Sequence, residues 1–492
     1  MRSQMGRTAA RLSSLALLSV LAVAQQHRIE TQANVVVRKD PYLNNNGQIP
    51  PKSQYSGPLF KLSHTWPAHA PAPMPEAPWR RAIGDQKITP HNAGAYVAAL
   101  KEYVGTDARK LFLDPDFNAA AAKWYNEPWL GSLREAIHGT YPAGQFGPSI
   151  FPGTGLKTTF DTHVLTYYYD RAAYPLTKVW GHSALKPAIN TANFQFPEGS
   201  VVVKAAVFVS DDPKIQSDWW PVTNGAAKWP LYLSIPASAK PQNPPQVING
   251  YVMQFDIIVK DTASAPKTGW VFSTLVYDVD APGKDAWDKM VPLGAMWGND
   301  PQANSSDANP PPLTENWINP NAPKYSTQTL GWGGRLSGPN DGATNDIQVG
   351  SQVMKNAPDS SCMSCHGPAQ WQPKEHKMIS FLLPSYPNPA PPPPPFKACG
   401  PNGEYICSPA PGSTDWMRWF QSRPGTEPQD PNTGSVACDY DMVFAFKTLP
   451  MWWKAMGPAG TPAPFSERLL RHDTLPPKQF NEYSGAPLKT QP

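Results

Sequence analysis

The residues with the clearest chemistry are Cys362-Met363-Ser364-Cys365-His366, which read Cys-X-X-Cys-His. Two cysteines three positions apart can each form a thioether to a vinyl group of haem, and the histidine that follows can ligate the iron. Cysteine is scarce in this chain, with five in 492 residues, so the motif stands well above chance. We therefore expect one covalently bound haem c, held by Cys362, Cys365 and His366.

Two other uses of a Cys-X-X-Cys pair compete with haem attachment. A zinc site needs two further ligands, which Cys399 and Cys407 could supply, but it leaves His366 without a role. A thioredoxin-like dithiol belongs to a βαβ pattern, and no such pattern surrounds the motif. Haem attachment is the interpretation that uses both cysteines and the histidine.

The N-terminal residues predict export. Arg2, Arg7 and Arg11 form a basic region, residues 12–23 are apolar, and an Ala-Val-Ala cleavage site ends at residue 24. This is the pattern of a secretory signal peptide over residues 1–24. No later run reaches the roughly 18 apolar residues of a membrane helix, so we expect no transmembrane segment in the mature chain. The expected location is periplasmic or secreted.

Export also bears on the remaining cysteines, because an oxidising compartment favours disulfides. Cys399 and Cys407 flank a turn-rich Gly-Pro-Asn-Gly segment, so we expect them to pair. Cys438 with either of the two is the alternative. One thiol is left over in any case.

Composition limits the partners. The formal net charge is +4, from 42 basic and 38 acidic residues, and the chain has no basic tract. We therefore expect no nucleic acid partner, and instead a redox partner protein or a small-molecule electron donor or acceptor. With 60 prolines, more than twice the average share, the chain is not expected to be mostly helical.

The expected elements change in type along the chain. Strand patterns rich in β-branched and aromatic residues occur at 201–209, 252–259 and 270–277, with weaker ones at 163–169 and 231–235. Their shortness and the Gly, Pro and Asp between them favour an antiparallel sheet. Helices are expected at 89–104, 116–125, 129–138 and 344–356, and from residue 440 to a stop at Pro450.

A helix followed by Cys-X-X-Cys-His-Gly and by later helices resembles the class I cytochrome c domain over residues 335–460. A Pro-rich insertion at 384–412 departs from that pattern. The remainder, with its segments 196–199 (Phe-Pro-Glu-Gly) and 296–301 (Met-Trp-Gly-Asn-Asp-Pro), resembles a poorly characterised group of secreted bacterial proteins that carry one c-type haem. The resemblance implies electron transfer and names no substrate.

The expected fold class is α+β, in which an N-terminal helical and loop region and an antiparallel β-rich domain precede a mostly α cytochrome c-like domain. The expected segments are a signal peptide (1–24), an extended polar arm (25–57), short helices and loops (58–157), the β-rich domain (158–330) and the haem domain (335–492).

The iron ligand opposite His366 decides between two functions. A Met or His there gives an electron-transfer haem, whereas an open position gives a haem-dependent, peroxidase-like oxidoreductase. Electron transfer is favoured because the chain has a single haem motif, and known bacterial peroxidases of this general kind usually carry two. We rank Met378 first as this ligand, then Met451 and Met417, and His376 also lies close in sequence.

Overall fold

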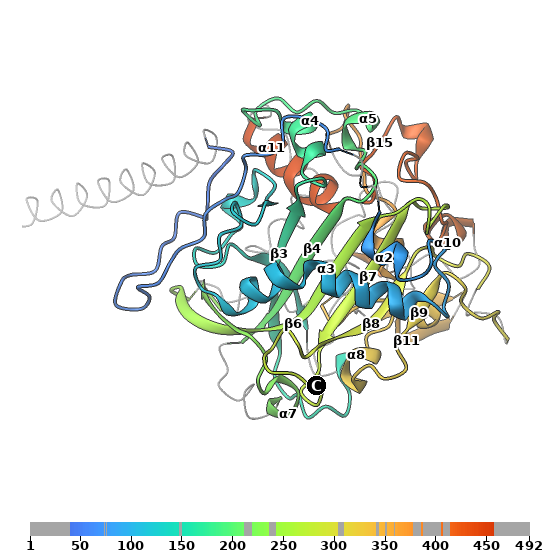
Figure 1. The fold of residues 1–492 in the computed structure, drawn as a ribbon, viewed down its shortest axis with the longest axis horizontal. Helices are drawn as coiled ribbons and strands as arrows, with labels where there is room; N and C mark the ends of the chain where they lie inside the picture. Colours follow the sequence, from blue (N-terminus) through green and yellow to red (C-terminus); the bar gives the residue numbers. More distant parts are fainter. Residues whose placement is uncertain are drawn as a thin grey trace, which may run out of the picture.

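The computed structural model describes residues 40–72, 74, 76–146, 150–210, 219–235, 243–303, 309–340, 344–349, 352–358, 360–376, 385–386, 405–406 and 414–456. In this part of the chain the dominant element is a nine-stranded antiparallel sheet (Figure 1). Its order is β1-β3-β4-β6-β7-β8-β9, with β2 beside β3 and β5 beside β6. The strands are β1 Trp124–Tyr125, β2 Tyr141–Phe146, β3 Phe160–Tyr169, β4 Val201–Val209, β5 Lys228–Leu233, β6 Gln246–Lys260, β7 Trp270–Tyr277, β8 Met290–Met296 and β9 Asn316–Ile318.

The strands follow the apolar runs of the sequence. The predicted strands at 201–209 and 270–277 are confirmed as β4 and β7, and the other three predicted runs overlap β3, β5 and β6. All eight residues of β7 are buried, as are eight of the nine in β4. Because side chains alternate between the two faces of a strand, a second layer must cover each face of this sheet.

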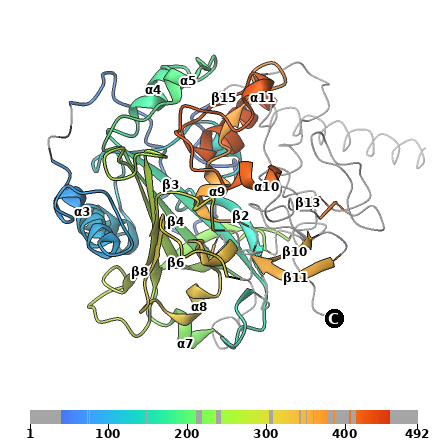
Figure 2. The same ribbon diagram turned by 90° about the vertical axis from the view of Figure 1, so that its right-hand side faces the viewer.

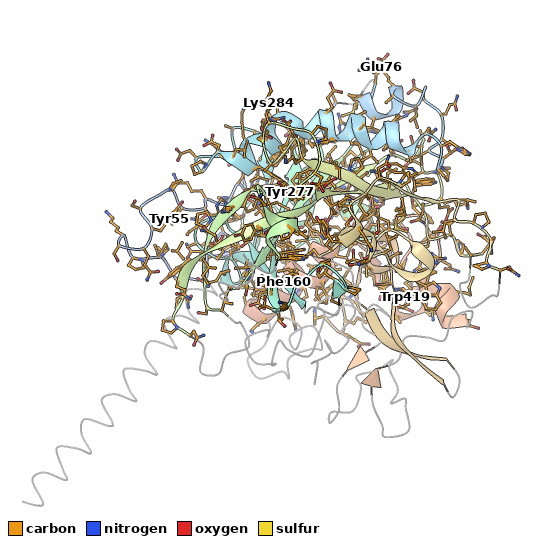
Figure 3. The ribbon with its side chains drawn as sticks, turned by 90° about the horizontal axis from the view of Figure 1, so that it is seen from below. Tyr55, Glu76, Phe160, Tyr277, Lys284 and Trp419 are labelled. Atoms are coloured by element: carbon orange, nitrogen blue, oxygen red, sulfur yellow. The ribbon has the colours of Figure 1, made fainter. Side chains whose placement is uncertain are left out.

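Helix α3 (Ala93–Leu113) covers one face, where it crosses the central strands (Figure 1). The predicted helical spacing is confirmed, since Tyr96, Val97, Leu100 and Val104 are all buried. The helix is longer than expected, and Phe112 near its end packs edge-on against Phe255 of β6, with ring centroids 5.6 Å apart. In Figure 3, Glu76 and Lys284 lie on this side of the sheet and Trp419 on the other.

The C-terminal part of the chain covers the opposite face (Figure 2), and this corrects the expected fold class. No mostly α domain forms in the described residues after 335. They contain a hairpin of β10 (Thr344–Val349) and β11 (Gln352–Pro358), together with short helices. Helices of five to eight residues are too short to bury their apolar sides against one another, so they pack on the sheet instead. One hydrophobic cluster joins Met363 and Cys365 to the strands and α3, across the expected boundary at 330–335.

Other predicted helices are also wrong. Residues 344–356 form β10 and most of β11. The segment 116–125 ends in strand β1, and 129–138 contains only the three-residue turn η1 (Leu130–Ser132). Pro450 does not stop the last helix. The π-helix η5 (Val443–Thr448) precedes it, and Pro450 then occupies the first turn of α11 (Leu449–Met456), where its missing N–H is tolerated.

The remaining elements are short. They are α2 Pro78–Arg81, α4 Tyr174–Trp180, α5 Thr191–Phe194, α7 Trp220–Thr223, α8 Lys324–Thr327, η3 Trp332–Gly334, α9 Cys362–His366, α10 Thr414–Trp419, η4 Pro431–Thr433, β12 Gln370–Trp371, β13 Ser385–Tyr386, β14 Tyr405–Ile406 and β15 Val436–Ala437. Residues 40–57 of the expected arm contain turns without a helix or strand. The predicted signal peptide at 1–24 and most of the 384–412 insertion lie outside the described residues. None of the described helices combines the length and apolar character needed to cross a membrane.

Candidate functional site

The motif forms the short helix α9, which begins at a reciprocal cap. The Ser361 hydroxyl accepts a hydrogen bond from Ser364 N at 3.1 Å, and Ser364 Oγ accepts one from Ser361 N at 2.7 Å. This capping box satisfies two backbone donors that a helix start leaves unpaired. Cys362 and Cys365, three positions apart in a helix, therefore lie on one side of it.

Three segments far away in sequence fix α9 through its backbone. Cys362 N donates to the carbonyl of Leu336 at 3.0 Å, and Trp419 Nε1 of α10 donates to the carbonyl of Ser364 at 2.8 Å. Met363 N lies 3.4 Å from Sδ of Met296, the last residue of β8. The helix is thus held against the sheet and α10 independently of the cysteine and histidine side chains.

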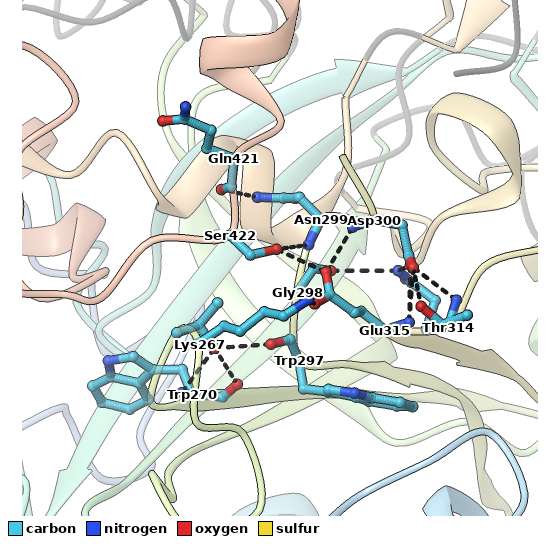
Figure 4. A network of polar contacts seen from close by, with 12 residues as sticks. Lys267, Trp270, Trp297, Gly298, Asn299, Asp300, Thr314, Glu315, Gln421 and Ser422 are labelled. Atoms are coloured by element: carbon cyan, nitrogen blue, oxygen red, sulfur yellow. Dashed lines mark hydrogen bonds and ion pairs between the residues drawn. The ribbon is translucent and has the colours of Figure 1, made fainter. Parts of the chain in front are cut away.

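A polar network behind α9 is built on the loop that follows β8 (Figure 4). Asn299 accepts a hydrogen bond from the Ser361 hydroxyl at 3.2 Å and donates to the carbonyl of Gln421 at 2.9 Å. Glu315 accepts from Ser422 Oγ at 2.7 Å and pairs with Lys267 at 2.6 Å. The segment 296–301 noted in the sequence therefore supports the cap of the motif helix.

His366 is oriented by a turn 74 residues further along the chain. Its Nδ1 lies 2.9 Å from the carbonyl oxygen of Tyr440, and its ring meets Phe272 edge-on at 4.9 Å. Asp439 and Tyr440 adopt φ angles of +47° and +66°, a costly conformation for residues other than glycine.

Buried contacts of Asp439 hold this turn in place. Its carboxylate pairs with Lys260 at 2.7 Å and accepts hydrogen bonds from Trp270 Nε1 at 2.8 Å and Phe196 N at 2.9 Å. Phe196 opens the second segment noted in the sequence, 196–199. Both noted segments therefore contribute to positioning the motif.

A cavity with an empty volume of about 790 Å³ opens beside His366, and a smaller lobe of about 400 Å³ adjoins it. Both share His366, Lys204 and Ile258, so they form one trough along the sheet. Cys362 and Cys365 line the smaller lobe. The main cavity is lined mostly by aromatic and aliphatic residues, including Tyr141, Tyr168, Phe196, Val202, Trp270, Tyr440, Met442, Val443 and Phe446.

The register of the sheet explains the floor of the trough. One row across the strands is Tyr168, Val202, Ile258 and Phe272, and the next row is Thr166, Lys204, Asp256 and Thr274. Paired residues point to the same face. The first row is apolar apart from one phenol group. In the second row, Lys204 forms an ion pair with Asp256 at 3.1 Å. The Asp256 carboxylate also accepts a hydrogen bond from Thr274 Oγ1 at 2.8 Å.

Ionisable groups are buried around the main cavity. Burial raises the pKa of Asp441 to about 6, although hydrogen bonds from Phe444 N and the Tyr168 hydroxyl act in the opposite direction. Behind it, burial and the charge of Asp441 raise the pKa of Glu127 well above its ordinary value. Burial lowers the pKa of Lys447 to about 7. Shifts of this kind concentrate at functional sites.

The structure places the candidates for the second iron ligand differently from the order expected from the sequence. Met378, ranked first, lies outside the described residues. Met417 packs against the cluster of Trp332, Trp419 and Phe420, and Met451 is buried in the main core; neither is among the residues that line the trough. Met442, which sequence reasoning did not rank, does line the main cavity.

His376 is also absent from the lining of the trough. Its ring stacks on Trp453 with centroids 3.4 Å apart, and burial lowers its pKa. No signal local to Met442 distinguishes it in sequence. Its position became apparent only from the fold of the turn at 439–442.

The site has the donor groups that covalent attachment of a haem requires. Two thiols and one imidazole lie on a single helix, and the imidazole Nδ1 is held by a carbonyl, as is usual for a metal-ligating histidine. Iron would then be bound through Nε2. The adjoining cavity is lined mainly by apolar residues, as cofactor sites usually are.

Cys438 is a buried thiol, with its Sγ 3.8 Å from the carbonyl of Val436. Cys399 and Cys407 lie outside the described residues, so their disulfide stays a prediction. In the part of the chain that the structure describes, no three His, Cys, Asp or Glu side chains gather into a metal-binding group. Comparison with protein-family models, curated proteins and solved structures found no match to this chain.

Proposed function

We propose that this protein is an exported c-type cytochrome with one haem bound through Cys362, Cys365 and His366. It would exchange single electrons with a redox partner protein or a small-molecule donor or acceptor. The observation that carries the proposal is that all three residues line one trough, in which Tyr440 engages His366 Nδ1 at 2.9 Å. The bound haem would supply reversible one-electron chemistry at iron.

The residues of the chain have separate tasks in this proposal. The S–H groups of Cys362 and Cys365 would add across the two vinyl groups and hold the macrocycle through thioether bonds, and His366 would ligate iron. The Tyr440 carbonyl accepts a hydrogen bond from Nδ1–H of His366, which fixes the tautomer and makes Nε2 a stronger donor to the metal. The apolar side chains of the cavity exclude water, so the potential is set by a few buried polar groups.

Export supports the proposal from a separate part of the sequence. Residues 1–24 have the pattern of a signal peptide, and covalent haem attachment in bacteria takes place outside the cytoplasmic membrane. The near-balanced charge gives no reason to expect nucleic acid as a partner. A periplasmic or secreted location is therefore part of the proposal.

The direct test is covalent retention of haem. The full chain is produced in the periplasm of a host with haem-attachment enzymes, denatured and stained for haem. The wild type should retain haem, Cys362→Ser and Cys365→Ser should each lose part of it, and the double variant should lose all of it. Cys438→Ala changes a buried thiol outside the motif and should retain haem fully. Loss of haem from the denatured wild type would refute the proposal.

The second iron ligand is tested on the same protein. A low-spin ferric spectrum with the far-red charge-transfer band of Met ligation would support electron transfer. Met378→Ala and Met442→Ala, compared with Met417→Ala as the control, then identify the methionine. If no band is present and the spectrum is low-spin, His376→Ala tests the remaining candidate.

A haem-dependent oxidoreductase is the second candidate function. The observation in its favour is the pair of buried ionisable groups at the cavity, Asp441 and Lys447, whose pKa values lie near neutrality. Such groups suit proton transfer at a reacting centre. A high-spin ferric spectrum that changes when hydrogen peroxide or cyanide is added would support this function over electron transfer.

A further inference from the structure

The trough beside α9 has two chemically different ends. Cys362 and Cys365 line the lobe that includes Phe272 and Thr274 of β7. At the other end of the sheet, Tyr141 of β2 lines the main cavity. From β7 the order runs through β6, β4 and β3 to β2, so four strand spacings, roughly 19 Å, separate these ends.

Polar groups gather at the β2 end. The Tyr141 hydroxyl lies 3.0 Å from Thr166 Oγ1, and both residues line the cavity. Lys447 of η5 lines it as well, with its Nζ 5.8 Å from the centre of the Tyr141 ring and 5.1 Å from that of Phe446. The Lys447 side chain reaches this end from the layer that covers the sheet, and the residue is 7% exposed.

A c-type haem has matching polarity. Its vinyl groups, which the cysteines bind, lie on one edge of the macrocycle, and its two propionates lie on the opposite side. A ring attached through Cys362 and Cys365 would therefore direct its propionates away from the β7 lobe and along the trough. A carboxylate that is taken out of water needs a cation or hydrogen-bond donors close by.

The two lysines that line the trough lie at different distances from the expected position of the propionates. Lys204 lies midway along the floor and pairs with Asp256 at 3.1 Å. Lys447 lies at the end where the propionates are expected, next to two hydroxyl groups. Burial lowers the pKa of Lys447 to about 7, so an anion beside it would stabilise its charged form.

We propose that Lys447 binds a propionate of the haem and so fixes the direction of the ring in the trough. This inference rests on the proposed function, because it requires a haem attached through the motif. Lys447 is then a positioning residue, and it acts on the potential of the iron through the charge that it places beside the propionate.

The test compares Lys447→Met with Lys454→Met in the haem-loaded full chain. Lys454 is exposed on α11, so its variant controls for the loss of one positive charge from the same region. We measure covalent haem, the resonance Raman bands of the propionates and the reduction potential. Lys447→Met should retain covalent haem, shift the propionate bands and lower the potential by about 59 mV or more, a tenfold change in the one-electron equilibrium. Lys447→Arg should keep the wild-type values.

Three results would overturn the inference. One is a Lys447→Met protein whose potential and propionate bands match those of Lys454→Met. Another is a change of axial ligation in Lys447→Met, which would make Lys447 an iron ligand. If Lys447→Met fails to fold, Lys447→Gln takes its place. The third result is then a Lys447→Gln protein whose reduction potential and propionate bands do not differ from those of wild type. Absence of covalent haem in the wild type would instead refute the proposed function, and these results are distinguishable from it.

Discussion

Replacing Asp441 by asparagine should change how stability depends on pH. Burial raises the pKa of this carboxyl to about 6 from an ordinary value of 3.8. The folded protein therefore holds the proton more tightly than the unfolded chain does. The favourable contribution to the free energy of unfolding is fully present below about pH 4 and is lost as the pH rises through about 6.

The size of the effect follows from the two pKa values. The difference between about 6 and 3.8 is worth about 3 kcal/mol in total, at roughly 1.36 kcal/mol for each pH unit. At pH 4 about half of the unfolded chains already carry an ionised Asp441, so about 2 kcal/mol of this falls between pH 4 and pH 7. Asparagine does not titrate. Relative to wild type, Asp441→Asn should therefore gain about 2 kcal/mol over this interval.

Only the difference between the two proteins is informative, because other buried groups titrate in the same interval. Burial lowers the pKa of His138 and of His163 to about 4 from 6.5, so both make the folded state more stable as the pH rises from 4 to 6.5. Their effect is the same in wild type and variant and cancels in the comparison. The pKa of Glu127 is raised in part by the charge of Asp441, so it falls in the variant and adds to the expected gain in the same direction.

The assay is chemical denaturation of wild type and Asp441→Asn at pH 4, 5, 6 and 7, with any haem that the protein retains kept in one oxidation state, because its charge would act on the same carboxyl. Asp280→Asn, at an exposed position, is the control. A difference between wild type and Asp441→Asn that stays constant with pH would refute the reasoning. So would a variant that loses stability relative to wild type as the pH rises, since Asp441 would then be stabilised in its ionised form.

Three further substitutions test the supports of the site by chemical denaturation. Gly331→Ala should cost about 1 to 3 kcal/mol and displace the start of the motif helix, because its Cβ would lie 1.8 Å from the carbonyl oxygen of Ser360; no loss of stability would contradict the close approach. Lys260→Met should lower the free energy of unfolding by about 3 to 5 kcal/mol, because it leaves the buried Asp439 carboxylate without its cation. Adding Asp439→Asn to this variant should recover part of the lost stability. Trp270→Phe should cost about 2 kcal/mol through the lost hydrogen bond to the same carboxylate, and an unchanged denaturation midpoint would show that this bond contributes little.

The strands were predictable where the residues alone determine burial. The run at 201–209 is apolar at all but one position, so it forms a buried strand whatever its neighbours are. The segment 344–356 was misread because its apolar residues also fit a helical spacing. Ile347 and Val349 alternate along β10, and Met354 pairs with Ile347 in the observed hairpin, so a strand pattern fits these residues at least as well.

The floor of the trough could not be predicted from the sequence, because it depends on strand register. Thr166, Lys204, Asp256 and Thr274 are scattered over 109 positions of sequence and form one row only when four strands pair as they do. A shift of one residue in any strand would turn its members to the α3 side. The Tyr440 carbonyl is equally remote, since its contact with His366 requires a left-handed turn that no local pattern of residues indicates.

The prediction of a cytochrome c-like domain was wrong for a related reason. The motif is local: two thiols and an imidazole at positions i, i+3 and i+4 of one helix meet the requirements of attachment on any scaffold that exposes that helix. The residues that would surround a haem are non-local, and in this protein they come from a sheet. Substitutions should therefore divide into two classes. Changes in α9 should alter the covalent retention of haem. Changes in residues that line the main cavity, such as Phe196→Ala, should leave the thioethers intact and alter the reduction potential and the optical spectrum of the haem. A motif thus transfers chemistry between proteins without transferring the fold that tunes it.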